Sequence, residues 1–221
     1  MISPRTLWLR CSVAILAGAL TAGCALVGLA GYAAPPPTIA AAYKGLAGQK
    51  VAVMVWTDRA MSIDWPTLQL DLTRGVQSRL VEASKQKEPP KELLATTFAM
   101  PESVIRYQRD HPEAETQSIT DVAPRMDITR LIYIEVEQFS TRPEESLELY
   151  RGSITANLKV VEVANGKAKI AFQKDKIKIV YPEKGPAEGL PGTTDLTVYE
   201  KTLQSFSTVV VNDFIPHQAE Q

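Results

Sequence analysis

The sequence predicts an α/β (α+β) fold: a single domain with a mixed sheet of about five strands, a long β-hairpin in its C-terminal half, and helices packed on the sheet. Residues 51–56 form an unbroken apolar run, as in a strand covered on both faces. Apolar residues recur every four positions through residues 68–80, as in a helix with one buried face. Asn165 and Gly166, which favour a type I′ turn, join two long alternating segments.

Local sequence patterns predict the helices and strands of the first half of the domain. The run at residues 51–56 is expected to be an inner strand of the sheet. Residues 57–65 are polar and predict a loop, after which Pro66 suits the first turn of the helix. The chain up to the hairpin then predicts a short strand, two short helices and a strand of strict apolar alternation, at residues 93–98, 102–110, 118–126 and 131–139.

The second half predicts the hairpin and a final helix. Lysines recur along the return strand and are expected to keep its outer face in solvent; they are Lys167, Lys169, Lys174, Lys176 and Lys178. Thr197 and Glu200 have the spacing of a capping box at a helix start. Apolar residues at three- and four-residue steps from Tyr199 to Phe214 predict a helix that packs on the sheet.

The first 24 residues have the layout of a bacterial lipoprotein signal. Arg5 and Arg10 precede an apolar run, and residues 20–24 (LTAGC) lead through small residues to a cysteine. Cleavage between Gly23 and Cys24 would leave Cys24 to carry the lipid. Two or more acyl chains give stable membrane anchoring, so the sequence predicts a membrane-anchored protein.

Two other interpretations of this segment are open. An uncleaved membrane helix over residues 11–29 would reach the ~20 residues that span a bilayer, although its glycines make a poor helix and no basic cluster follows. Ordinary secretory cleavage could use residues 17–19, Ala-Gly-Ala. Because Ala25, and not Asp, follows Cys24, we expect the anchor in the outer membrane, facing the periplasm. Inner-membrane anchoring and secretion are the alternative locations.

Four segments follow from these patterns. They are the signal peptide (1–23), the lipidated cysteine with an Ala/Pro/Gly-rich tether (24–48), the globular domain (49–217) and a short tail (218–221). Three consecutive prolines at residues 35–37 predict a stiff centre in the tether.

Charge and cysteine content exclude several classes of function. Removing residues 1–23 takes away Arg5 and Arg10 and no acidic residue, which leaves 22 basic and 25 acidic side chains. This mild negative charge predicts no nucleic-acid partner. Both cysteines, Cys11 and Cys24, precede the domain, so no thiol is left there for a disulfide, a metal site or a nucleophile.

The domain shows no motif for catalysis, a cofactor or a metal. His111 and His217 are the only histidines, and neither has a partner at ligand spacing. Glu135 and Glu137 share a strand face, as a catalytic pair would, but pairing with lysines of a neighbouring strand is the simpler interpretation. Residues 45–50 lack the spacing and the Ser or Thr of a phosphate loop. We therefore expect no enzyme, no cofactor and no metal.

Three aromatic residues are the candidate lining of a ligand groove. Trp56, Trp65 and Tyr107 are expected near the carboxyl end of the first strand, where open sheets place their ligands. The alternative is that these rings belong to the core.

A resemblance is carried by the strand at residues 50–56 with its helix, by residues 127–134, and by the hairpin segment 154–169 with its turn at 163–167. This pattern resembles periplasmic lipoproteins of the curli-secretion and penicillin-binding-protein-activator type, through element order and turn placement. The curli-type members form pores through long hairpins, and the short charged loop at residues 140–151 offers no room for one. The resemblance therefore implies an envelope protein that is not a channel.

The sequence as a whole predicts a lipid-anchored, non-enzymatic cell-envelope protein whose periplasmic domain binds a partner protein, in an assembly or activator role. A small-ligand-binding module of the periplasm is the alternative. A hydrolase is a third hypothesis, which requires polar residues to converge in a pocket.

Overall fold

The computed structural model describes residues 37–143, 148–186 and 188–219. The predicted cleavage site at Gly23 and Cys24 lies outside these residues and stays a prediction. Residues 40–217 form one compact unit. β1 (Thr38–Ile39) and β7 (His217–Gln218) pair in a separate two-stranded sheet. None of the helices described has the length and the apolar surface that a bilayer crossing requires.

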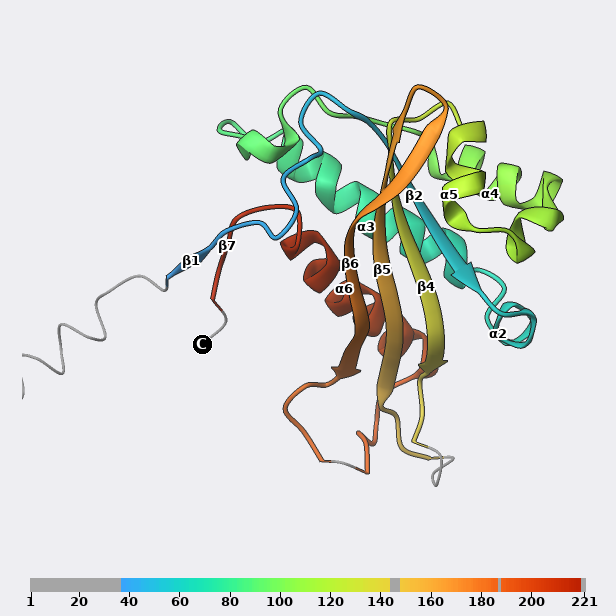
Figure 1. The fold of residues 1–221 in the computed structure, drawn as a ribbon. Helices are drawn as coiled ribbons and strands as arrows, with labels where there is room; N and C mark the ends of the chain where they lie inside the picture. The colour runs from blue at the N-terminus through green and yellow to red at the C-terminus, as the bar shows by residue number, and fades with distance from the viewer. Residues whose placement is uncertain (1–36, 144–147, 187, 220–221) are drawn as a thin grey trace, which may run out of the picture. The chain divides into compact units, whose positions relative to one another are not determined.

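The domain is built on a five-stranded sheet in the order β3-β2-β4-β5-β6 (Figure 1). Its strands are β2 (Lys50–Thr57), β3 (Thr97–Phe98), β4 (Arg130–Ser140), β5 (Gly152–Ala164) and β6 (Lys167–Tyr181). β2 runs parallel to both of its neighbours, whereas β4, β5 and β6 are antiparallel. The mixed sheet and the inner position of β2 are therefore as predicted. β3 pairs with β2 only at Lys50 and Val51, which leaves the rest of that β2 edge without a neighbouring strand.

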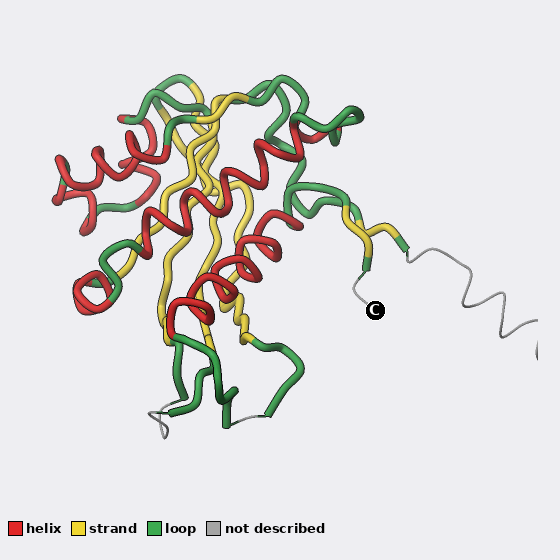
Figure 2. Tube along the Cα trace, turned by 180° about the vertical axis from the view of Figure 1, so that it is seen from behind, coloured by secondary structure: helices red, strands yellow, loops and turns green. Residues whose placement is uncertain are grey.

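Two long helices, α3 (Leu68–Ser84) and α6 (Asp195–Asn212), cover one face of the sheet (Figure 2). The predicted four-residue stripe of α3 is confirmed, because its members have no exposed surface: Leu68, Leu72, Val76 and Leu80. Phe206 and Val210 of α6 are equally buried and belong to the same hydrophobic cluster. The main core therefore lies between these two helices and the sheet.

Shorter elements cover the half of the second face near the β5–β6 turn. They are α4 (Pro101–Asp110), the 3-10 turn η2 (Pro112–Thr116), α5 (Ile119–Val122) and the 3-10 turn η3 (Ala123–Arg125). Ala52 and Met54 of β2 pack there in a smaller cluster with Val104 and Leu131. Both faces of β2 are covered, as its apolar run predicts. In Figure 1 the other half of this face, on β4, β5 and β6, has no helix in front of it.

The hairpin turn has the predicted geometry. Asn165 and Gly166 have φ values of 52° and 72°, the two positive angles that a type I′ turn requires. β6 is an edge strand, and four of its five lysines are exposed, as predicted: Lys167, Lys169, Lys176 and Lys178. Lys174 differs, because its Nζ donates to both carboxylate oxygens of Asp213 (2.9 and 3.0 Å).

The loop predicted at residues 57–65 contains a short helix, α2 (Arg59–Asp64). Asp58 caps this helix by accepting a hydrogen bond from the backbone N–H of Met61 (2.7 Å). The second predicted strand is reduced to two residues, since the 3-10 turn η1 (Lys91–Leu93) takes the preceding positions.

The last helix begins earlier than predicted. Thr194 is its N-cap, and the side-chain oxygen of Thr194 accepts a hydrogen bond from the backbone N–H of Thr197 (3.2 Å). The capping box predicted at Thr197 and Glu200 is therefore wrong, because Thr197 already lies in the first turn. The predicted apolar stripe is unaffected by this shift.

Residues 40–48, which the sequence assigns to the tether, pack on the domain. Tyr43 and Leu46 are 8% and 0% exposed and belong to the main core. The Tyr43 hydroxyl donates to Glu162 Oε1 (2.9 Å), and the Tyr43 backbone N–H donates to the carbonyl of Asp213 (2.9 Å). The packed domain therefore starts several residues before position 49.

Candidate functional site

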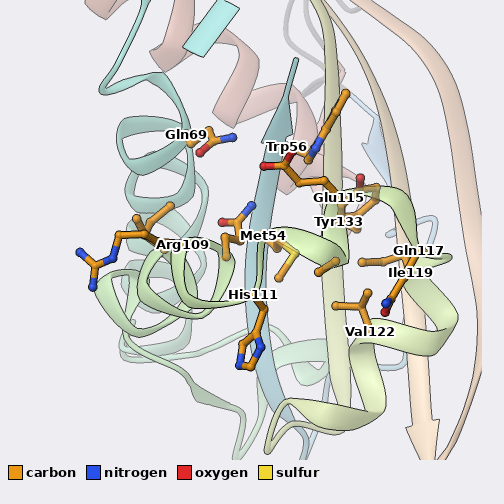
Figure 3. Close-up of a pocket in the computed structure, with 13 residues that line it drawn as sticks. Met54, Trp56, Gln69, Arg109, His111, Glu115, Gln117, Ile119, Val122 and Tyr133 are labelled. Carbon is orange, nitrogen blue, oxygen red and sulfur yellow. The ribbon is translucent and has the colours of Figure 1, made fainter. Parts of the chain in front are cut away.

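A cavity of about 170 Å³ lies between β2, β4 and the segment from α4 to α5. Figure 3 shows side chains from these elements turned toward one another around it. Met54 of β2 is almost fully buried and lines it, together with Ile119 and Val122 of α5 and Tyr133 of β4. These residues make one side of the cavity apolar. Met54 points here because successive residues of β2 face opposite sides of the sheet.

Three uncharged polar atoms of the lining residues are buried without a hydrogen-bond partner among the described residues. They are Trp56 Nε1, Gln108 Oε1 and Gln117 Oε1. A buried polar group without a partner costs about 1–3 kcal/mol of stability. Each of these atoms has almost no accessible surface, so it lies behind the surface of the cavity and does not face its open space.

Gln108 is held in place by the incomplete edge of β2. Its Nε2 donates to the carbonyl of Val55 (2.9 Å). That carbonyl needs a partner because β3 extends no further along β2 than Val51. With Nε2 bonded to Val55, the Gln108 Oε1 is left buried without a hydrogen-bond partner among the described residues.

Three exposed residues that carry or can carry a charge also line the cavity: Arg109, His111 and Glu115. Arg109 is 3.3 Å from Asp110, and the Nδ1 of His111 is 3.1 Å from Glu113. The pKa of Glu113 is lowered by its own backbone hydrogen bond first and by His111 in addition. The lining of the cavity therefore combines neutral polar side chains with charged ones.

Tyr133 adds a neutral hydroxyl to the cavity lining. Burial, with the nearby Glu135 carboxylate, raises the pKa of the Tyr133 phenol well above its ordinary value. The phenol therefore stays protonated at any physiological pH.

The structure separates the three aromatic residues predicted to share a groove. Trp56 lines the cavity, and the ring of Tyr107 lies beside it, 4.5 Å from the ring of His111. Trp65 lies on the opposite face of the sheet, stacked on Tyr199 with ring centroids 5.7 Å apart. The shared groove is therefore wrong for Trp65, because α2 carries the chain round to the side of α3 and α6.

Two glutamines of the cavity were missed by sequence reasoning. Gln108 and Gln117 belong to no motif, and an amide on a short helix or turn looks like a solvent-facing residue. One signal was available: Gln108 lies three positions from Ile105, on one face of the same short helix.

The other candidate groups make ordinary surface contacts. Glu135 lies 3.6 Å from Lys159 on the neighbouring strand, and Glu137 accepts a hydrogen bond from Asn157 (2.7 Å). Across the described ranges, no group of three or more His, Cys, Asp or Glu side chains has the spacing to hold a metal ion. Glu135 therefore has a lysine partner on the neighbouring strand, as the simpler interpretation predicted, whereas the partner of Glu137 is an asparagine.

No protein-family model matches the chain, and no curated protein matches it. Solved structures that align with it include the hypothetical protein CT253 of Chlamydia trachomatis, 13% identical over 75% of this chain and 96% of its own, with a TM-score of 0.43. Lipoprotein GNA1162 of Neisseria meningitidis is 11% identical over 74% of this chain and 93% of its own, with a TM-score of 0.41. The PelC dodecamer of Paraburkholderia phytofirmans is 11% identical over 85% of this chain and 96% of its own, with a TM-score of 0.39.

A lipoprotein is thus among the structures similar to this chain. Identities and TM-scores this low show no family. The resemblance to the curli-secretion and penicillin-binding-protein-activator type therefore stays a prediction.

Proposed function

We propose that the protein is a lipid-anchored, non-enzymatic protein of the cell envelope whose periplasmic domain binds a small molecule in the cavity beside Trp56. The supporting observation is the lining of this cavity, which is apolar on the side of Met54, Ile119 and Val122 and which also includes the neutral polar side chains of Gln69, Gln108 and Gln117. Small-molecule sites combine an apolar lining with a few placed polar groups in this way.

The size of the cavity limits the ligand. One water molecule needs about 10–15 Å³ of such volume, so a cavity of about 170 Å³ accepts a molecule about the size of a single substituted ring. A folded peptide or a protein loop does not fit, and this favours the small-ligand module over a protein partner at this place.

The anchor part of the proposal rests on the sequence around Cys24. The test is intact-mass analysis of the amino terminus of the protein isolated from its native membranes. We expect an acylated Cys24 as first residue, with the protein in the outer-membrane fraction. Cys24→Ser should leave a longer, unacylated precursor. An unmodified terminus, or a Cys24→Ser protein processed like the native one, would refute the anchor.

The ligand part is tested by fragment screening of the acylated protein in detergent micelles, read by ligand-observed NMR. We expect ring-sized fragments that bind the native chain and Trp65→Phe but not Trp56→Phe. Trp65→Phe is the matched control, because the same substitution is made on the opposite face of the sheet. Fragments that bind all three proteins equally, or none, would contradict a site at Trp56.

A protein partner is the second candidate, and the uncovered half of the sheet favours it. The strands β4, β5 and β6 carry polar and charged side chains, among them Glu137, Asn157 and Lys178. A photo-crosslinking residue at position 157 is expected to capture one partner in intact cells, and the same residue at Ser78 of α3, on the other face, is the control. Equal crosslinking from both positions would argue against a partner on this face.

A further inference from the structure

We propose that the free edge of β6 at residues 167–170 binds a short extended segment of a partner protein in which acidic and apolar residues alternate. β6 is the last strand in the order β3-β2-β4-β5-β6, so its outer edge pairs with no other strand of the described chain. Such an edge carries unpaired backbone N–H and C=O groups, to which an added strand can bond. This edge is separate from the cavity beside Trp56, which no residue of β6 lines.

The pairing of β6 with β5 locates the segment. Residues 167–170 pair one to one with residues 161–164 of β5. Directly beyond them β6 has one extra residue, because Ile170 pairs with Val161 whereas Phe172 pairs with Val160. Such a bulge interrupts regular pairing. A regular added strand therefore matches residues 167–170 and not the whole of β6.

The two faces of this segment differ in chemistry. Lys169 Nζ lies 3.2 Å from Glu162, and the lysine side chain is still 75% exposed. Lys167 shares the face of Lys169, because side chains alternate along a strand, and is exposed as well. Ala168 packs against the smaller hydrophobic cluster on the other face, which it shares with Ile170. Since Ile170 is 43% exposed, the segment presents a basic face and an apolar one.

The alternation defines the partner. Side chains of an added strand also alternate, so every second residue neighbours the lysines and the residues between them neighbour Ile170. Opposite charges and apolar pairs stabilise such cross-strand positions, and like charges destabilise them. Two copies of this edge would place lysines opposite lysines in the register that keeps their apolar faces together. The partner is therefore an acidic and apolar segment and not a second copy of the chain.

The other charged groups around the segment do not cancel the two lysines. The Glu162 carboxylate lies 3.6 Å from the Arg130 guanidinium. On the other face, Asp121 and Arg125 line the same groove beside the hairpin. Each of these acidic side chains therefore has an arginine near it, and the lysines leave this edge with a net positive charge.

The experiment measures the fluorescence anisotropy of a labelled hexapeptide of alternating Glu and Val, with the acylated full chain in non-ionic detergent micelles. One comparison peptide has Lys in place of Glu, and another has the same composition with the glutamates in one block. The alternating acidic peptide should bind at least tenfold more tightly than each of them. Equal or tighter binding of a comparison peptide would refute the acidic, alternating class. Binding of none would overturn the proposal and leave the cavity beside Trp56 unaffected.

Backbone pairing is tested with two methylated forms of the acidic peptide. One carries N-methyl groups on its valines, and the other carries them on its glutamates. Alternate N–H groups of a strand point to the same side, so pairing with β6 uses only one of the two sets. One methylated peptide should therefore bind at least tenfold more weakly than the other. Equal binding of the two would refute strand pairing.

A charge exchange places the site on β6. Replacing both Lys167→Glu and Lys169→Glu should weaken the acidic peptide at least tenfold and strengthen the lysine peptide at least tenfold. This gain cannot come from a misfolded variant. Lys87→Glu with Lys91→Glu is the matched control, because it makes the same change of charge between α3 and β3, at the other edge of the sheet. Equal effects of the two double variants would refute a site on β6.

The apolar face is tested at Ile170. Ile170→Asn should weaken the acidic peptide at least fivefold, because the valines then lose their apolar neighbour. Leu94→Asn is the control, since Leu94 is 50% exposed and precedes β3 at the other edge. Equal affinities of the two variants would refute the apolar half of the match.

Discussion

The substitution Leu46→Ala distinguishes a tether from a packed segment at residues 40–48. Leu46 has no exposed surface, and its carbonyl accepts hydrogen bonds from the Thr96 hydroxyl (2.8 Å) and the Gln49 N–H (3.1 Å). These bonds hold the backbone, so the space left by the shortened side chain cannot close easily. Leu→Ala changes at such sites cost about 2–5 kcal/mol, and we expect about 3 kcal/mol here. In a tether the cost would stay within about 0.5 kcal/mol.

The assay is urea unfolding of the full chain, followed by tryptophan fluorescence. With a slope of about 2 kcal/mol per molar urea, a loss of about 3 kcal/mol lowers the midpoint by about 1.5 M. Leu94→Ala is the matched control, because the same change is made at a side chain that is 50% exposed. An unchanged midpoint for Leu46→Ala, or an equal shift for both variants, would show that residues 40–48 do not belong to the core.

The other predictions concern one tyrosine and two glycines. Burial, and after it the hydrogen bond to Glu162, raises the pKa of the Tyr43 phenol from 10.0 to about 12. The contribution of this protonated phenol to the free energy of unfolding is therefore complete below pH 10 and is lost as the pH rises through about 12. An ultraviolet titration should therefore lose its step at about 12 in Tyr43→Phe, and an identical titration would contradict this. Gly152→Ala places a methyl group against the Thr202 side chain and should cost about 1–3 kcal/mol in urea unfolding; a second change, Thr202→Ala, should restore part of it. Gly166→Ala meets no neighbour but has a φ of +72°, so about 1 kcal/mol should be lost, and a neutral result would refute the turn geometry.

Regular patterns in the sequence predicted most of the sheet and the helices that cover it. The apolar run of β2 predicted a strand covered on both faces, and the structure places it between two hydrophobic clusters. The apolar stripe of α3 and the Asn165-Gly166 turn were likewise predicted from local residue patterns. Burial requires apolar residues at a regular spacing in β2 and α3, and a positive φ favours Asn and Gly in the turn, so the residue types show these requirements directly.

Features that depend on distant contacts could not be predicted in this way. Tyr43 and Leu46 lie in a segment rich in small residues, and only their contacts with remote parts of the chain distinguish them from a linker. Trp56 and Trp65 are close in sequence but lie on opposite faces of the sheet because of α2. Gln117 becomes a site candidate only when the fold brings it to the lining of the cavity.

The pairing of Tyr43 with Asp213 affects how the domain would respond to mechanical load. A pull on the chain at residue 40 would first load this backbone hydrogen bond and the hydrogen bond from the Tyr43 hydroxyl to Glu162, before it loads the sheet. Once these contacts and the packing of Leu46 are lost, residues 40–49 could span at most about 33 Å before tension reaches β2. Because Tyr43 and Leu46 belong to the main core, releasing the segment would remove part of that core, and the domain would therefore oppose the load before the chain lengthens.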